Sequence, residues 1–247
     1  MGQKTDYSYY GEGIIYARAA GGKLRDIGNC SALNLAMEEE EQALRNFRGG
    51  GGNRNKIRRP TDVTVTITMH DLSPENLEMV LRGTVSEVSV TTVTEEEHVV
   101  VEGALNRLDA LPDHDEDIVI TNDAGDTTYE ENADYRLTPS GFIPLADGDI
   151  DDGETVKVDY TKRPQAIVQA LMTSAVDMEM VFEGMNEARS GAPVVVSLWR
   201  ARLGAPEDIE WIGDDYASLS VPADLLADTA RPAGTSQFFQ VEMATAA

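Results

Sequence analysis

Three kinds of residue in this 247-residue chain could do chemistry: histidines, acidic clusters and a run of glycines. His70, His98 and His114 lie in three different segments, and none has a partner at the spacing of a metal site or a catalytic triad. We therefore interpret them as surface residues, with a metal or catalytic role as the alternative. The single cysteine, Cys30, starts an apolar stretch, which favours a buried thiol over a reactive one.

The acidic and glycine-rich motifs also fall short of known binding loops. Residues 147–154 read DGDIDDGE, but the glycine stands at the seventh position of a calcium loop instead of the sixth, and Val158 replaces the closing glutamate. Residues 112–117, PDHDED, are an acidic turn that could hold a cation incidentally. Gly49–Gly52 lack the Gly-Lys-Ser/Thr ending of a phosphate loop. We expect no catalysis, no cofactor and no metal site, and so predict that the protein is not an enzyme.

Carboxylates recur instead on the polar sides of alternating strands. Apolar Leu33, Leu35 and Met37 alternate with polar or small residues, and so do Val63, Val65, Ile67 and Met69 and, later, Val176, Met178, Met180 and Phe182. This alternation predicts strands with one buried and one wet face. The wet faces then carry acids and threonines with no Lys or Arg, namely Glu38, Glu40, Thr64, Thr66, Thr68, Asp177, Glu179 and Glu183.

Residues 42–59 separate the first two strands and differ from them in composition. The segment holds six basic residues and no acidic one. Its glycines and charges cannot bury much surface, so the sequence predicts a long mobile loop that gains order on another subunit. The residues that would make this contact are Arg45, Phe47, Arg48, Gly49, Gly50, Gly51, Gly52, Arg54, Lys56, Arg58 and Arg59.

Other signals place the remaining elements. A hairpin is expected around Gly21-Gly22, and a helix over about 73–82 with Ser73 as N-cap, Pro74 at the first position and Gly83 at the stop. Residues 223–228 suggest a short helical turn. Further strands are expected at residues 99–101, 118–121, 135–138, 155–160, 194–202 and 237–243.

Charged residues are distributed unevenly along the chain. Its net charge is −24, yet residues 95–162 alone hold 20 acidic and four basic residues. Such a chain is no conventional nucleic-acid binder, because phosphates are bound by clustered cations. We predict a first part of the main domain at 1–94, an inserted acidic β domain at 95–162, and the rest of the main domain at 163–247. The sequence shows no signal peptide or membrane-spanning segment, so we expect a soluble protein made in a cytoplasm.

The order of these motifs resembles the tail tube, or major tail, proteins of long-tailed bacteriophages of the siphovirus type. Four stretches carry the resemblance: residues 29–41 (NCSALNLAMEEEE), 47–53 (FRGGGGN), 63–83 (VTVTITMHDLSPENLEMVLRG) and 176–203 (VDMEMVFEGMNEARSGAPVVVSLWRARL). It implies a mainly β fold, a tail-tube-type β-sandwich or barrel with one short helix. The long Gly-rich loop would stack rings, and the small β domain would be an insertion.

The resemblance also implies a function and partners. Six copies would form a ring, and stacked rings would form the tail tube of a virion, assembled in the host cytoplasm. The acids and threonines of the wet faces would then line a lumen through which DNA passes during ejection, repelling phosphates. The residues alone leave an ordinary solvated sheet face equally open. Expected partners are further copies of the chain, a tape measure protein, and tail terminator and tail tip proteins. The alternative is a β-rich, adhesin-like binding module whose acidic domain recognises a ligand.

Overall fold

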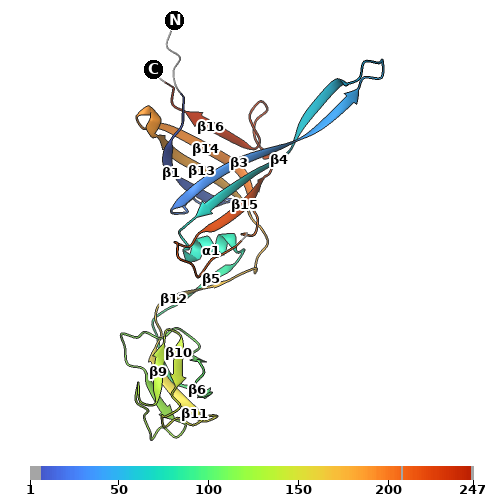
Figure 1. The fold of residues 1–247 in the computed structure, drawn as a ribbon. Coiled ribbons are helices and arrows are strands. Elements are labelled where there is room, and N and C mark those ends of the chain that lie inside the picture. The colour runs from blue at the N-terminus through green and yellow to red at the C-terminus, as the bar shows by residue number, and fades with distance from the viewer. Residues whose placement is uncertain (1–6, 207, 246–247) are drawn as a thin grey trace. The chain divides into compact units, whose positions relative to one another are not determined.

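A computed structural model describes residues 7–206 and 208–245 of the chain, and it consists mainly of strands. Strands account for 51% and helices for 4%, which confirms the expected mainly β fold. Two compact units are present (Figure 1). Unit 1 comprises the chain up to Thr84 and from Val168 onward, and unit 2 is Val85–Ile167. The predicted insertion 95–162 lies inside unit 2, which begins earlier and ends later.

Unit 1 is built on one antiparallel sheet of eight strands in the order β2-β1-β13-β14-β15-β4-β3, with β16 also paired to β14. The strands are β1 Gly11–Ala19, β2 Arg25–Asp26, β3 Cys30–Arg45, β4 Asn53–Met69, β13 Asp177–Asn186, β14 Ala192–Leu203, β15 Leu219–Leu225 and β16 Phe239–Met243. A 3₁₀ turn, η1 Glu187–Arg189, joins β13 to β14. The expected hairpin is present, although β2 is only two residues long.

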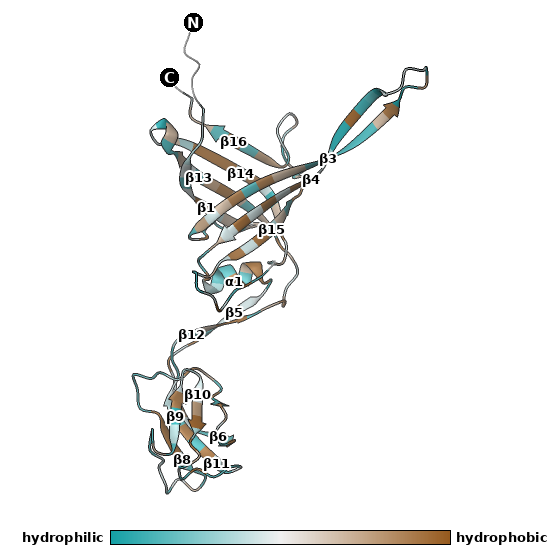
Figure 2. Cartoon of the chain, in the orientation of Figure 1, coloured by the Kyte–Doolittle hydropathy of each residue, from teal (hydrophilic) through white to brown (hydrophobic). Residues whose placement is uncertain are grey.

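One face of this sheet forms the core of unit 1. Ile15 of β1 and Val65 of β4 come from strands far apart in the sheet, yet both belong to one cluster of buried side chains with Met180, Leu198 and Val221. A sheet whose distant strands share one core must curl over it. Figure 2 shows the alternation of apolar and polar residues along these strands that this packing requires.

Helix α1, Pro74–Val80, covers part of this core, with Val80 buried in it. The Ser73 hydroxyl accepts a hydrogen bond from the Asn76 backbone N–H at 3.2 Å, which confirms the predicted cap. Buried Asn76 joins the helix to the first hairpin: its Nδ2 donates to the carbonyl oxygens of Ile27 and Asp71, both at 2.8 Å. Its Oδ1 accepts from Arg25 at 3.0 Å.

Unit 2 has its own hydrophobic core, which includes Ile120, Phe142, Val156, Val158 and Tyr160. Two three-stranded sheets, β7-β10-β9 and β6-β11-β8, enclose it, and β5 pairs with β12 in a separate ribbon. The strands are β5 Thr84–Val88, β6 Thr92–Val99, β7 Asn106–Arg107, β8 Val119–Asn122, β9 Tyr135–Thr138, β10 Gly141–Pro144, β11 Thr155–Thr161 and β12 Gln165–Gln169.

The helical turn predicted at residues 223–228 is wrong. Strand β15 occupies Leu219–Leu225, with Leu219, Val221 and Leu225 buried. Pro222 in its middle hides the alternation, because proline usually argues against a strand with neighbours on both sides. Here β14 pairs with only the last part of β15, and the Pro222 carbonyl accepts from the Gly204 N–H at 2.7 Å.

Candidate functional site

The polar face of the unit 1 sheet is the first candidate surface. Directly paired residues share a face, and one row of pairs crosses five strands. The row runs Ala36, Thr64, Asp224, Arg202, Asp177. Alternation from this row places the predicted Thr66, Thr68, Glu38, Glu179 and Glu183 on the same face, opposite to the core. The structure therefore brings the predicted strand residues onto one surface.

This surface does carry cations, contrary to the expectation from sequence. Arg18 on β1 lies opposite Glu179 and binds it with Nη2 to Oε2 at 2.6 Å and Nε to Oε2 at 2.9 Å. Arg200 and Arg202 bind the two oxygens of Asp177 at 2.6 and 2.7 Å. The basic residues come from β1 and from alternate positions of β14, strands that the prediction did not place beside β13.

A β-bulge explains how Asp177 binds two arginines. The β13–β14 register shifts between Met178 and Met180, so that Arg200 and Arg202 both turn toward Asp177. The hydrogen bond from Arg202 is the main reason that the pKa of Asp177 is lowered; burial raises this pKa, and the hydrogen bond from Arg200 and the charges of both arginines lower it further. The two arginines therefore compensate the negative charge of Asp177, and Arg18 compensates that of Glu179.

The remaining acids of the face stay without a cation. Within residues 7–206 and 208–245, the Glu38 and Glu183 side chains form no ion pair, and both are exposed. Glu40 lies beyond a second bulge, between Glu38 and Glu39, and is paired in register with Arg59. The face thus combines half-buried threonines, two compensated acids and a few free carboxylates.

Strand β3 is the edge of the sheet, and two of its core-side residues are exposed. Leu35 and Met37 pair with buried Val65 and Val63, yet Leu35 is 37% and Met37 is 65% exposed. The prediction that they are buried is wrong for the single chain, because on β3 the core reaches only Cys30 and Leu33 among the described residues. An apolar edge of this kind favours pairing with another chain.

The predicted loop 42–59 is mostly a β-hairpin, which is the second candidate surface. Strands β3 and β4 stay paired from Glu39 with Pro60 to Arg45 with Asn53, so only residues 46–52 form the turn. Figure 1 shows this hairpin extending beyond the rest of the unit 1 sheet. The mobile-loop prediction is therefore wrong for most of the segment: cross-strand hydrogen bonds satisfy the backbone without a buried core.

The turn itself is also ordered by hydrogen bonds. The Asn46 N–H donates to the Gly52 carbonyl at 3.0 Å, and Asn46 Nδ2 donates to the Gly49 carbonyl at 2.8 Å. Gly49, Gly50, Gly51 and Gly52 all have positive φ, between 69° and 92°. Glycine adopts such angles without strain, so the glycine run allows an ordered tight turn and does not produce disorder.

Charges on the hairpin fall into a paired and an unpaired set. Glu41 binds Lys56 at 2.6 Å and Arg58 at 3.2 Å, and these two hydrogen bonds lower the pKa of Glu41. Within the described part of the chain, four arginine side chains of the hairpin form no ion pair: Arg45, Arg48, Arg54 and Arg59. Phe47 at the turn is 83% exposed.

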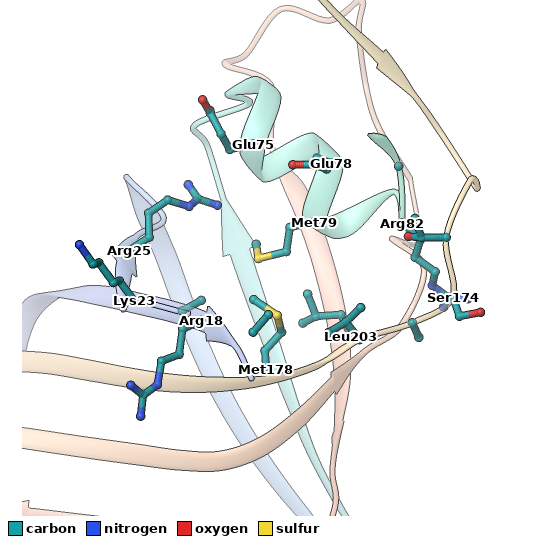
Figure 3. A pocket seen from close by; sticks show the side chains of 16 residues that line it. Arg18, Lys23, Arg25, Glu75, Glu78, Met79, Arg82, Ser174, Met178 and Leu203 are labelled. Carbon is teal, nitrogen blue, oxygen red and sulfur yellow. The ribbon is translucent and has the colours of Figure 1, made fainter. Parts of the chain in front are cut away.

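A cavity of about 460 Å³ in unit 1 is the third candidate, and no sequence motif predicted it (Figure 3). It lies between α1, the first hairpin and residues 173–176, with Met79, Met178 and Leu203 forming an apolar floor. Glu75, Glu78, Lys23, Arg25 and Arg82 are among its charged lining residues. Helix packing against strand ends creates it, and it holds no nucleophile paired with a base.

The other predicted motifs do not converge on a site. Among the described residues, no group of three His, Cys, Asp or Glu side chains is arranged to hold a metal ion. His98 Nε2 lies 2.8 Å from Glu96 Oε1 inside unit 2, where Glu96 also accepts from Tyr160 at 2.7 Å. Cys30 is half-buried, and burial followed by Asp26 and Asp71 raises the pKa of its thiol to about 11. No helix in the described ranges has the length and apolarity needed to cross a bilayer.

Comparison with known proteins gives a family but no activity. No curated protein matches the sequence significantly. A family model matches residues 8–242, which span both units and both candidate surfaces. The chain therefore belongs to the family described as Protein of unknown function UCP028589.

Proposed function

We propose that the protein is a structural subunit of a bacteriophage tail tube, in which six copies form a ring and stacked rings form a conduit for DNA. The order of sequence motifs suggests this function, and the large antiparallel sheet with a projecting hairpin supports it. The protein acts by assembly and has no catalytic step.

The open edge at β3 carries the proposal. Leu35 and Met37 occupy the core side of the edge strand, and each leaves much of its surface in water in the single chain. Fully burying one such side chain yields about 1.5–3 kcal/mol. An edge strand of a neighbouring copy would cover them and pair with β3 at the same time, which continues the sheet from subunit to subunit.

The opposite face suits a wall along which DNA moves. Arg18, Arg200 and Arg202 are each bound to a carboxylate, so they offer phosphates no free cation. Free Glu38 and Glu183 repel phosphates, and the threonines are neutral. A polymer that binds nowhere on the wall can slide.

Electron microscopy of concentrated protein tests assembly. We expect hollow tubes, and a molecular mass that rises with concentration in size-exclusion chromatography. Leu35→Asp with Met37→Asp should abolish tubes and leave the far-UV circular dichroism unchanged. The matched control is Val99→Asp, since Val99 in unit 2 is 68% exposed and should tolerate a charge. A protein that stays monomeric at every concentration would support the adhesin-like alternative.

Charge reversal tests the conduit separately. Tubes of a Glu38→Lys, Glu183→Lys variant should retain DNA in a filter-binding assay, whereas wild-type tubes should not. Equal DNA binding by both would count against a lumen lined by this face. In a virion, a tape measure protein would occupy the lumen, and terminator and tip proteins would close the ends.

A further inference from the structure

The projecting hairpin needs a surface to receive it, and the loop between β14 and β15 has the matching properties. Residues 208–216 leave three large side chains in water: Trp211 is 67%, Ile212 93% and Tyr216 96% exposed. Ile209 holds the loop to the core by a bridge to Leu219, so the aromatic residues project from a fixed base.

The charges of loop and hairpin are complementary. The loop carries Asp208, Glu210, Asp214 and Asp215, and within the described ranges none of them forms an ion pair. The hairpin carries four unpaired arginines and exposed Phe47. Guanidinium groups stack on Trp and Tyr rings and bind carboxylates with two hydrogen bonds.

One chain cannot make this contact with itself. Leu219, at the end of the loop, pairs with Met69, the last residue of β4. The hairpin turn adjoins Asn53, the first residue of the same 17-residue strand. At about 3.3 Å per residue the two ends lie about 55 Å apart. The hairpin of one copy can reach the loop only of another copy, which makes the contact head-to-tail.

Two other groups of exposed apolar residues fit less well. Leu171 and Met172 are exposed, but the residues beside them, from Gln169 to Ser174, carry no charge. Unit 2 is acidic and exposes Val99, Val101 and Leu105, but these are aliphatic and offer arginine no ring. The β14–β15 loop combines acids with aromatic side chains.

We propose that residues 208–216 are the receptor for the hairpin tip of a second copy of this chain. The inference rests on the proposed function, since it names the surface through which successive rings bind. Phe47 would lie against Trp211 and Tyr216, and the hairpin arginines against the loop acids.

Disulfide trapping between two singly substituted chains tests the contact. In a Cys30→Ser background, differently tagged Phe47→Cys and Trp211→Cys proteins are mixed and oxidised with copper phenanthroline. Phe47→Cys with Val101→Cys is the matched control, because Val101 is 54% exposed and adjoins Glu102. We expect about tenfold more of the Phe47–Trp211 product, which corresponds to a preference of about 1.4 kcal/mol. Equal yields, or no product, would overturn the inference.

Charge exchange tests the electrostatic part. Arg45→Glu, Arg48→Glu and Arg54→Glu together should abolish the cross-link. Adding Asp208→Arg, Asp214→Arg and Asp215→Arg to the partner should restore it. If these variants do not fold by circular dichroism, the yield of the singly substituted pair at 50 and 500 mM NaCl decides the point, and a yield independent of salt contradicts charge pairing.

Microscopy of the unoxidised mixture separates this inference from the proposed function. Tubes without the Phe47–Trp211 link would overturn the receptor loop and leave the tail tube proposal standing. A link between chains that never form tubes would overturn the tail tube proposal and leave the contact standing.

Discussion

The chemical properties of individual polar residues in this protein depend on the groups that they contact. Asp177 binds two arginines, and Glu96 accepts hydrogen bonds from the Tyr160 hydroxyl and the Asp109 N–H. The Cys30 thiol forms no such contact among residues 7–206 and 208–245, and it lies near Asp26 and Asp71. We therefore expect the reactivity of Cys30 and the pH dependence of stability at Glu96 to be set by these contacts.

Cys30 should react slowly with alkylating reagents. The pKa of its thiol is raised from 9.0 to about 11, so the thiolate fraction at pH 8 falls about a hundredfold. We expect iodoacetamide to label the folded protein about a hundredfold more slowly than the protein in urea. Equal rates in the two states would show that burial does not protect the thiol.

Glu96 should stabilise unit 2 in a pH-dependent way. Burial raises the pKa of Glu96, but hydrogen bonds from Tyr160, the Asp109 N–H and His98 outweigh burial and lower it. The stabilisation is present above the ordinary pKa of 4.5 and is lost as pH falls through the lower folded-state value.

Glu96→Gln should therefore lower the stability of unit 2 by about 1–2 kcal/mol at pH 7, with a smaller effect near pH 3. Hydrogen exchange of the Ile120 and Val156 amides measures it. Glu97→Gln is the matched control, since Glu97 is exposed on the same strand and should change exchange little. A pH-independent effect of Glu96→Gln would show that ionisation of Glu96 does not stabilise unit 2.

At the scale of elements, the β3–β4 hairpin extends beyond the core of unit 1, and its proposed role is in assembly. Strand pairing extends, with two register shifts, to Arg45 and Asn53, well beyond Val63, the last buried residue of β4 toward the turn. The backbone N–H and C=O groups of the hairpin are paired between its strands, but its side chains bury little surface in a single chain.

Shortening the hairpin should separate folding from assembly. Replacing residues 42–57 by Asn-Gly joins Glu41 to Arg58, which already face each other, through a two-residue turn. We expect unchanged thermal unfolding within about 0.5 kcal/mol, because the removed residues bury no core. Tubes should fail to form in electron microscopy. Normal tubes from the shortened protein would show that assembly does not require the hairpin.

At the scale of the whole molecule, two cores divide the chain. The core of unit 2 shares no residue with that of unit 1. The chain leaves and re-enters unit 1 at neighbouring points, since the Leu171 N–H donates to the Leu81 carbonyl at 2.9 Å. A Cβ on Gly83 would lie only 2.6 Å from the Gln169 carbonyl oxygen. Close ends of this kind are typical of inserted units.

Removing unit 2 should leave unit 1 folded. A short Gly/Ser linker between Thr84 and Val168 spans neighbouring backbones, and the buried residues of unit 1 remain. We expect a soluble protein with cooperative thermal unfolding that still forms tubes. An insoluble product, although the parent is soluble, would show that residues 85–167 contribute to the core fold.

The sequence by itself determined the features that depend on neighbours along the chain. Alternation predicted the buried face of β4 and, from Met178 onward, that of β13, but was wrong for Val176, which precedes β13 and is 51% exposed. Ser73-Pro74 predicted the start of α1. Charge marked the acidic segment that lies within unit 2. These signals are local, because a strand's period and a helix cap depend on residues two or three positions apart.

Tertiary structure alone decided which residues meet from distant segments. Strand order leaves Leu35 and Met37 exposed at an edge, although their alternation matches that of buried strands. Register and a bulge bring Arg18, Arg200 and Arg202 onto the acidic face. Periodicity says which side of a strand is apolar, but only the neighbouring strands determine whether that side is covered and which charges lie opposite.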